Sequence, residues 1–74
     1  MNTHEFTGRL FRHVRLKRKE SYRKFAALLG IHYTTLYRYE QARKGPSRST
    51  LQRLVAVSGA ASLEALTREA FALF

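Results

Sequence analysis

Side chains suited to reading DNA bases gather in the middle of the chain. Two tyrosines, a threonine and an arginine fall within residues 33–38, at spacings that place them on one side of a helix over about residues 33–41. Arginine can grip the O6/N7 edge of guanine with two hydrogen bonds, and tyrosine and threonine can contact thymine methyl groups or phosphates. A solvated helix face would carry Glu and Lys instead. The predicted base-reading residues are His32, Tyr33, Thr34, Tyr37 and Arg38.

Other interpretations of these side chains stay open. Arg38 could contact a phosphate instead of a base. Tyr33 and Tyr37 lie one turn apart, so they could form a surface pair in which the rings only cover each other. The opposite side of the predicted helix carries Leu36 and Tyr39, which we expect to point into a core.

The preceding segment predicts a second short helix and a tight turn. Phe25, Ala26 and Leu29 share one face of a helix, and Ser21 can cap its first turn. Gly30 ends this helix, because glycine adopts the left-handed conformation that turns the chain sharply. Two helices joined in this way form either an ordinary hairpin or a helix-turn-helix, which places one helix in the major groove of DNA. The outer side chains favour the second interpretation.

A basic loop follows the candidate reading helix. Gly45-Pro46 marks a turn, and Ser47 can cap a further helix. Backbone N–H groups at the start of a helix attract anions, and neighbouring cations can hold phosphates. A loop that is only solvated is the alternative. The predicted DNA-backbone contacts in this region are Arg43, Lys44, Ser47 and Arg48.

The charge of the chain is unevenly distributed. Its 74 residues carry a formal charge of +9, and +8 of this lies in residues 1–47. The basic part therefore coincides with the predicted helix-turn-helix. This coincidence favours double-stranded DNA as the partner over an acidic protein.

The composition argues against several other classes of protein. The chain has no cysteine, and its three histidines show no ligand spacing with carboxylates, so we expect no disulfide, no metal and no cofactor. No catalytic triad, carboxylate cluster or phosphate-binding glycine loop indicates an enzyme. No apolar run approaches bilayer length, and the first residues are no signal peptide. We therefore expect a cytoplasmic, nucleoid-associated protein without a membrane partner.

The whole pattern predicts one all-α, compact five-helix domain over residues 1–74. A first helix is expected over about residues 5–19, a fourth from Ser47 to Gly59, and a fifth that starts at Ser62. The sequence shows no strand signal. The apolar residues predicted for these three helices are Phe6, Leu10, Phe11, Val14, Leu51, Leu54, Val55, Val57, Leu63, Leu66, Ala70 and Phe71.

The pattern resembles the phage-repressor and Cro-type helix-turn-helix family over about residues 10–59. The matching residues are Arg15, Ser21, Phe25, Ala26, Leu29, Gly30, Ile31, Leu36, Tyr39, Glu40, Pro46, Ser47, Leu51 and Leu54. The resemblance implies a compact five-helix domain whose third helix reads the major groove. It also implies that Tyr22, at the start of the second helix, lies near the DNA backbone.

Four positions depart from the pattern of that family. Glu20 stands where an apolar residue is usual, and Ser58 replaces a leucine. His32 stands where serine or threonine caps the third helix, and histidine is a poorer cap. Lys24 replaces a capping acid and adds a cation that attracts phosphate. The predicted DNA-backbone contacts on the second helix are Ser21, Tyr22 and Lys24.

Arg15 and Glu40 predict an internal ion pair. Arg15 lies beside the apolar stripe of the first helix near Val14, and Glu40 lies near the inward side of the third helix. Such a pair would tie the scaffold to the reading helix and keep the carboxylate away from phosphate. Two independent surface charges are the alternative.

The C-terminal segment is more apolar than so small a domain can bury. We expect residues 62–74 to mediate a homodimer, which would give a roughly palindromic DNA site, unless the last residues fray. The predicted interface residues are Leu63, Leu66, Ala70, Phe71 and Phe74.

These patterns together predict a sequence-specific, double-stranded-DNA-binding transcriptional regulator, specifically a repressor. One alternative is a protein-interaction module, such as an antitoxin that binds and neutralises a partner protein. Leu28 favours it, because this residue lies outside the predicted buried face. A membrane-active basic helix over residues 5–19 is a further alternative.

Overall fold

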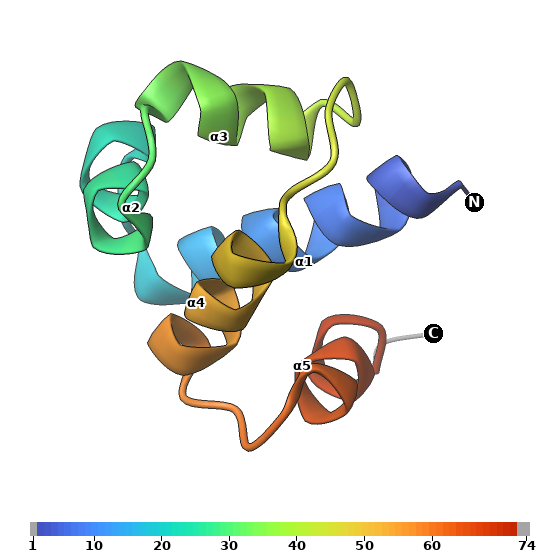
Figure 1. Ribbon diagram of the computed structural model, residues 1–74. Coiled ribbons are helices and arrows are strands. Elements are labelled where there is room, and N and C mark those ends of the chain that lie inside the picture. Colours follow the sequence, from blue (N-terminus) through green and yellow to red (C-terminus); the bar gives the residue numbers. More distant parts are fainter. Residues whose placement is uncertain (1, 73–74) are drawn as a thin grey trace.

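The computed structural model describes residues 2–72, which form five helices and no strand (Figure 1). The predicted all-α, five-helix fold is thereby confirmed. The helices are α1 (Thr3–Arg18), α2 (Tyr22–Leu29), α3 (Tyr33–Glu40), α4 (Arg48–Ser58) and α5 (Leu63–Ala70). α1 packs against α3, α4 and α5, while α2 packs against α3 and α4. No helix in residues 2–72 is both long and apolar enough to cross a membrane. The same residues contain no group of His, Cys, Asp and Glu side chains that could hold a metal ion.

Side chains that accept hydrogen bonds from first-turn N–H groups set the starts of the helices. Ser21, Ser47 and Ser62 each accept from the N–H group three residues later, at 3.1–3.2 Å. Asn2 does the same for α1, because its Oδ1 accepts from the Glu5 N–H group at 2.8 Å. α1 therefore starts two residues before the predicted position.

The turn between α2 and α3 is fixed by a glycine and by an arginine from α4. Gly30 adopts the left-handed conformation, with a φ of 70°. Arg53 Nη1 donates to the Leu29 carbonyl oxygen at 3.1 Å, and a side chain at Gly30 would collide with this guanidinium. The turn thus has the predicted glycine together with a tertiary contact that the sequence did not indicate.

The hydrophobic core is built around α1. Leu10 and Phe11 are completely buried, and they belong to one cluster with buried side chains from each of the other helices. The buried core residues are Leu10, Phe11, Val14, Phe25, Ala26, Leu29, Leu36, Tyr39, Leu54 and Leu66. Leu51, Val55 and Val57 only partly join this core, and Leu63 stays 37% exposed. The apolar sides of α4 and α5 are therefore only partly buried inside the domain.

α1 and α3 cross in close contact at Gly8. A side chain at this position would collide with the Tyr39 carbonyl oxygen and would lie 3.3 Å from the Tyr39 carbonyl carbon. Next to the crossing, the Phe11 and Tyr39 rings pack with centroids 5.0 Å apart. This contact seats the inner side of α3 directly on α1, so its opposite side is left to solvent.

A polar and aromatic clamp joins α1 to α5. Lys17 and His13 both contact Glu69 Oε1, at 2.5 and 3.0 Å. Hydrogen bonds from these two side chains hold the pKa of Glu69 below its ordinary value. The Phe6 and Phe71 rings stack with centroids 5.5 Å apart. α5 is thus packed into the folded domain, and Phe71 is already partly covered within one chain.

Candidate nucleic-acid interface

The outer side of α3 presents the predicted base-reading residues together. Leu36 and Tyr39 are buried on the inner side, as expected from the spacing. Figure 1 shows α3 along the upper edge of the domain, with α1, α4 and α5 below it. Tyr33 is half-buried, and the others on the outer side are exposed: His32, Thr34, Tyr37 and Arg38.

His32 caps the start of α3. Its Nδ1 atom accepts a hydrogen bond from the Thr34 backbone N–H group at 3.2 Å and lies 2.7 Å from the Thr34 hydroxyl oxygen. The imidazole also stacks on the Tyr33 ring, with centroids 4.5 Å apart. The poorer capping residue is therefore supported by ring stacking, and the first turn of α3 is well defined.

Tyr33 and Tyr37 contact different partners instead of covering each other. The Arg23 guanidinium lies over the Tyr33 ring, with 4.1 Å from its carbon to the ring centroid. Tyr37 packs edge-on against Tyr22 at 5.8 Å and stays 45% exposed. Arg23 was not among the predicted site residues, because nothing in the sequence indicates which side chain of α2 reaches the start of α3.

The structure brings Arg15 and Glu40 into a bidentate ion pair. Arg15 Nε and Nη2 donate to the two carboxylate oxygens at 2.8 and 3.0 Å. The arginine side chain is 13% exposed and the carboxylate side chain 1%. Hydrogen bonding to Glu40 raises the pKa of Arg15 above its ordinary value.

The same guanidinium packs on the second helix. The Arg15 guanidinium carbon lies 4.1 Å from the centroid of the Tyr22 ring. Because Tyr22 in turn contacts Tyr37, one connected group of side chains supports the middle of α3 from α1 and α2. Tyr22, predicted near the DNA backbone, is half-buried within this group.

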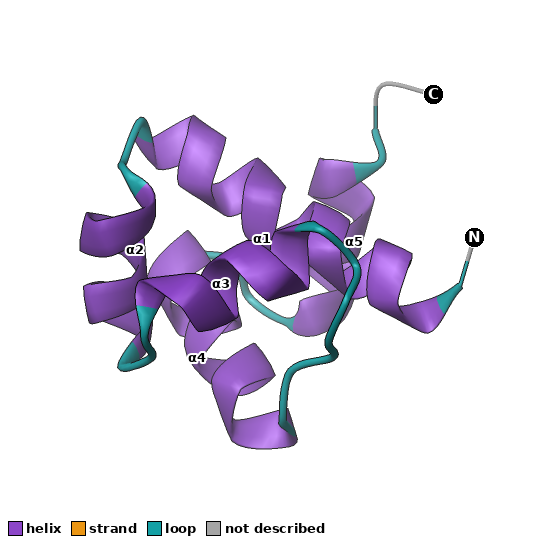
Figure 2. Cartoon of the chain, turned by 90° about the horizontal axis from the view of Figure 1, so that it is seen from above, coloured by secondary structure: helices purple, strands orange, loops and turns teal. Residues whose placement is uncertain are grey.

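The predicted phosphate contacts lie at the starts of α2 and α4 and in the loop after α3, which Figure 2 shows running from α3 to α4. Six of the seven predicted residues are exposed, the exception being the half-buried tyrosine of α2: Ser21, Lys24, Arg43, Lys44, Ser47 and Arg48. The Ser21 and Ser47 hydroxyl oxygens already accept backbone hydrogen bonds. The Ser21 hydroxyl can still donate its proton to an outside acceptor, whereas the Ser47 hydroxyl also lies 3.1 Å from the Ser49 hydroxyl and 2.9 Å from the Thr50 hydroxyl.

The α5 residues predicted for a dimer interface fall into different environments. Leu66 is completely buried in the core of its own domain, so its prediction as an interface residue is corrected: it has no surface to offer a second copy. Ala70 and Phe71 are half-buried, and the Phe71 ring lies against Phe6. Phe74 lies outside the described residues.

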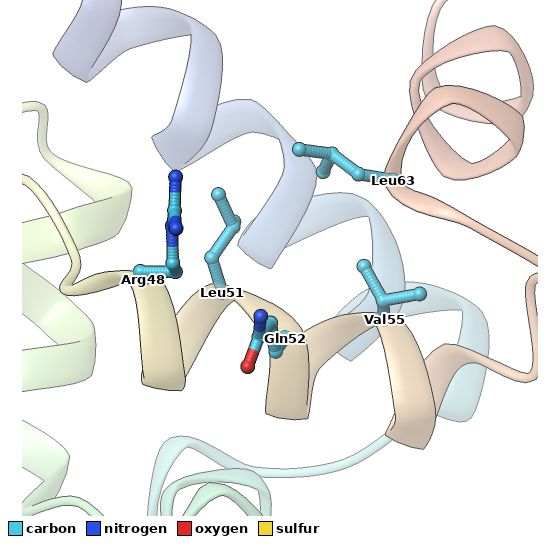
Figure 3. A pocket seen from close by; sticks show the side chains of 5 residues that line it. All are labelled: Arg48, Leu51, Gln52, Val55 and Leu63. Atoms are coloured by element: carbon cyan, nitrogen blue, oxygen red, sulfur yellow. The ribbon is translucent and has the colours of Figure 1, made fainter.

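Leu63 borders an open groove between α4 and α5 (Figure 3). The groove has a volume of about 490 Å³ and mainly apolar walls. Its lining residues are Arg48, Leu51, Gln52, Val55 and Leu63. This groove contains the apolar side chains of α4 and α5 that the core leaves uncovered.

The chain matches the model of a known protein family. A family model described as a helix-turn-helix domain matches residues 7–70, a span that contains all of α2, α3, α4 and α5. No curated protein and no solved structure matches the chain.

Proposed function

We propose that this chain, which belongs to the helix-turn-helix domain family, is a transcriptional regulator that binds a specific duplex DNA sequence through α3. The observation that carries this proposal is the exposed, polar and aromatic side of a short helix that rests on a rigid support. Leu36 and Tyr39 anchor α3 in the core, and the Arg15–Glu40 pair fixes its end. Preorganised side chains of this kind suit the reading of base edges in the major groove.

The charge of the domain supports the same function. Most of the +9 formal charge lies in α1, α2, α3 and the loop before α4. Lys44 and Arg48 are exposed next to the start of α4, where free N–H groups also favour anions. We assign the base contacts to α3 and the phosphate contacts to the starts of α2 and α4 and to the loop.

Replacing Arg38 with alanine should weaken binding to the preferred site by about 1–3 kcal/mol and relax the preference at one base position. Lys44→Ala is the matched control. It should lower the affinity for all DNA sequences alike and make the affinity less dependent on salt concentration. Selection of bound sites from random duplex DNA, followed by titrations at several salt concentrations, measures both effects. If Arg38→Ala changes neither affinity nor base preference, α3 is not the reader.

A repressor is the form of regulator that we favour, acting in the cytoplasm on the nucleoid. The described residues form a compact binding unit, and occupancy of an operator by such a unit is enough to exclude polymerase from a promoter. A reporter gene placed behind the selected site should therefore fall in expression when the chain is present. A rise in expression would identify an activator instead.

We further propose that the chain binds DNA as a homodimer through the groove between α4 and α5. Leu63 is exposed beside apolar side chains that a second copy can cover, and an interface of ordinary size buries about 800 Å² per partner. A two-fold pair would place two copies of α3 about 34 Å apart, which is one turn of DNA.

Leu63→Ser should weaken binding to a palindromic site about tenfold and leave binding to a single half-site unchanged, because only the contact between copies is lost. Leu28→Ser is the matched control, since Leu28 is 44% exposed on α2 and lies outside the groove. Footprinting and titrations on one-half-site and two-half-site duplexes separate these outcomes. One copy bound to an asymmetric site at saturation would contradict the dimer.

A protein partner is the second candidate function, and the exposure of Leu28 favours it. An antitoxin would use such an apolar position on α2 to bind and neutralise an acidic protein. Leu28→Ser would then abolish a stoichiometric complex with that protein. The regulator proposal instead expects Leu28→Ser to leave DNA binding unchanged.

A further inference from the structure

Arg23 connects the first turn of α2 to the first residue of α3. Its guanidinium lies over the Tyr33 ring at 4.1 Å, where the electron-rich face of the ring attracts a cation. The Tyr33 ring also stacks on His32, whose Nδ1 atom accepts from the Thr34 backbone N–H group. A continuous set of contacts thus runs from Arg23 through two rings to the backbone of the candidate reading helix.

These contacts determine which part of Tyr33 is available to DNA. A guanidinium and an imidazole already lie against the ring, which restricts flat packing on a thymine methyl group. The Tyr33 hydroxyl has no hydrogen-bond partner among residues 2–72. A phenolic hydroxyl can donate to acceptors on base edges, such as purine N7, guanine O6 or thymine O4.

We propose that Arg23 is a positioning residue that holds the Tyr33 hydroxyl in place for one base and so sets the sequence preference at that position. The inference rests on the proposed function, because it requires α3 to lie in the major groove. Arg23 folds over a ring on the neighbouring helix, with its guanidinium carbon 4.1 Å from the Tyr33 ring centroid. Its charge therefore acts on the geometry of Tyr33.

The test compares sites selected from random duplex DNA by the wild-type chain and by variants of the two residues. Tyr33→Phe keeps the ring and its contacts but removes the hydroxyl, so the preference at one base position should fall about tenfold. Arg23→Ala should lower the preference at the same base position about fivefold. In a chain that already carries Arg23→Ala, the further change Tyr33→Phe should lower this preference little more. Arg23→Lys should retain most of the preference, because it keeps a cation near the ring.

Lys24→Ala is the matched control, since Lys24 is the next cation on the exposed first turn of α2. Lys24→Ala should lower the affinity for all DNA sequences alike, without changing the base preference. The dependence of affinity on salt concentration should fall by the amount expected for about one lost phosphate contact. Thermal unfolding confirms that each variant is folded.

The outcomes separate this inference from the function on which it rests. A wild-type chain that selects no sequence contradicts the proposed function. A wild-type chain that selects a site, combined with an Arg23→Ala variant that keeps the same preferences or behaves like Lys24→Ala, overturns only the positioning role. An unchanged preference for Tyr33→Phe overturns it as well, because the hydroxyl then reads no base.

Discussion

Replacing Arg15 with methionine is expected to lower the free energy of unfolding by about 3–5 kcal/mol. The reason is the environment of Glu40, whose carboxylate is 1% exposed and receives both of its hydrogen bonds from this guanidinium. Without the cation, a negative charge stays in a nearly water-free site with no compensating partner. Chemical denaturation at neutral pH measures the loss.

A double-mutant cycle separates the ion pair from other effects of the substitution. The double variant Arg15→Met/Glu40→Gln should lose clearly less stability than the two single variants lose together, because it leaves no uncompensated charge. Arg18→Met is the matched control on the same helix. Its partner is Glu20, and the two side chains are 40% and 19% exposed, so its loss should stay below about 1 kcal/mol. Additive losses in the cycle would mean that Arg15 and Glu40 act as independent charges.

The ends of the elements show what the sequence can predict about the fold. Serine hydroxyls cap α2, α4 and α5 where the sequence indicates, because capping depends on a few consecutive residues. The start of α1 was missed by two residues, although Asn2 and Glu5 form a reciprocal capping pair that spacing alone reveals. Local chemistry thus carries most of the information about where a helix begins.

The candidate site also has features that depend on local sequence and features that depend on how the helices pack. Periodicity correctly separates the buried Leu36 and Tyr39 from the exposed Tyr37 and Arg38, because that separation depends only on the rotation per residue. Which side chain of another helix meets each of them depends on how the helices cross. The contact of Arg23 with Tyr33 is of this second kind, and so is that of Arg53 with the Leu29 carbonyl group.

The interface prediction for α5 failed at Leu66 for a related reason. An apolar stripe on a helix indicates that its residues prefer to be buried. It does not indicate whether they are buried in their own domain or against another surface. The apolar stripe of α5 packs on α1 of the same domain, and this contact buries Leu66 completely. Leu63 lies at the edge of the stripe and stays exposed. Only the packed structure shows which apolar residues remain exposed.

Replacing Gly8 with alanine is expected to cost about 3 kcal/mol of the free energy of unfolding, at the upper end of the usual range for overpacking. Alanine is the better helix former by about 1 kcal/mol, so helix propensity alone predicts the opposite sign. The new Cβ would collide with the Tyr39 carbonyl oxygen and approach the Glu40 Cα atom to 3.5 Å. Both obstacles are backbone atoms, so α1 and α3 must move apart.

Gly45→Ala is the matched control, because its Cβ would meet only the His4 imidazole, a side chain that can rotate away. It should change stability by less than about 1 kcal/mol. Separation of α1 from α3 also draws Glu40 away from Arg15, so Arg15→Met should cost less in the Gly8→Ala background than in the wild type. A Gly8→Ala variant that is more stable than the wild type, or that leaves the cost of Arg15→Met unchanged, would show that this crossing does not set the position of α3.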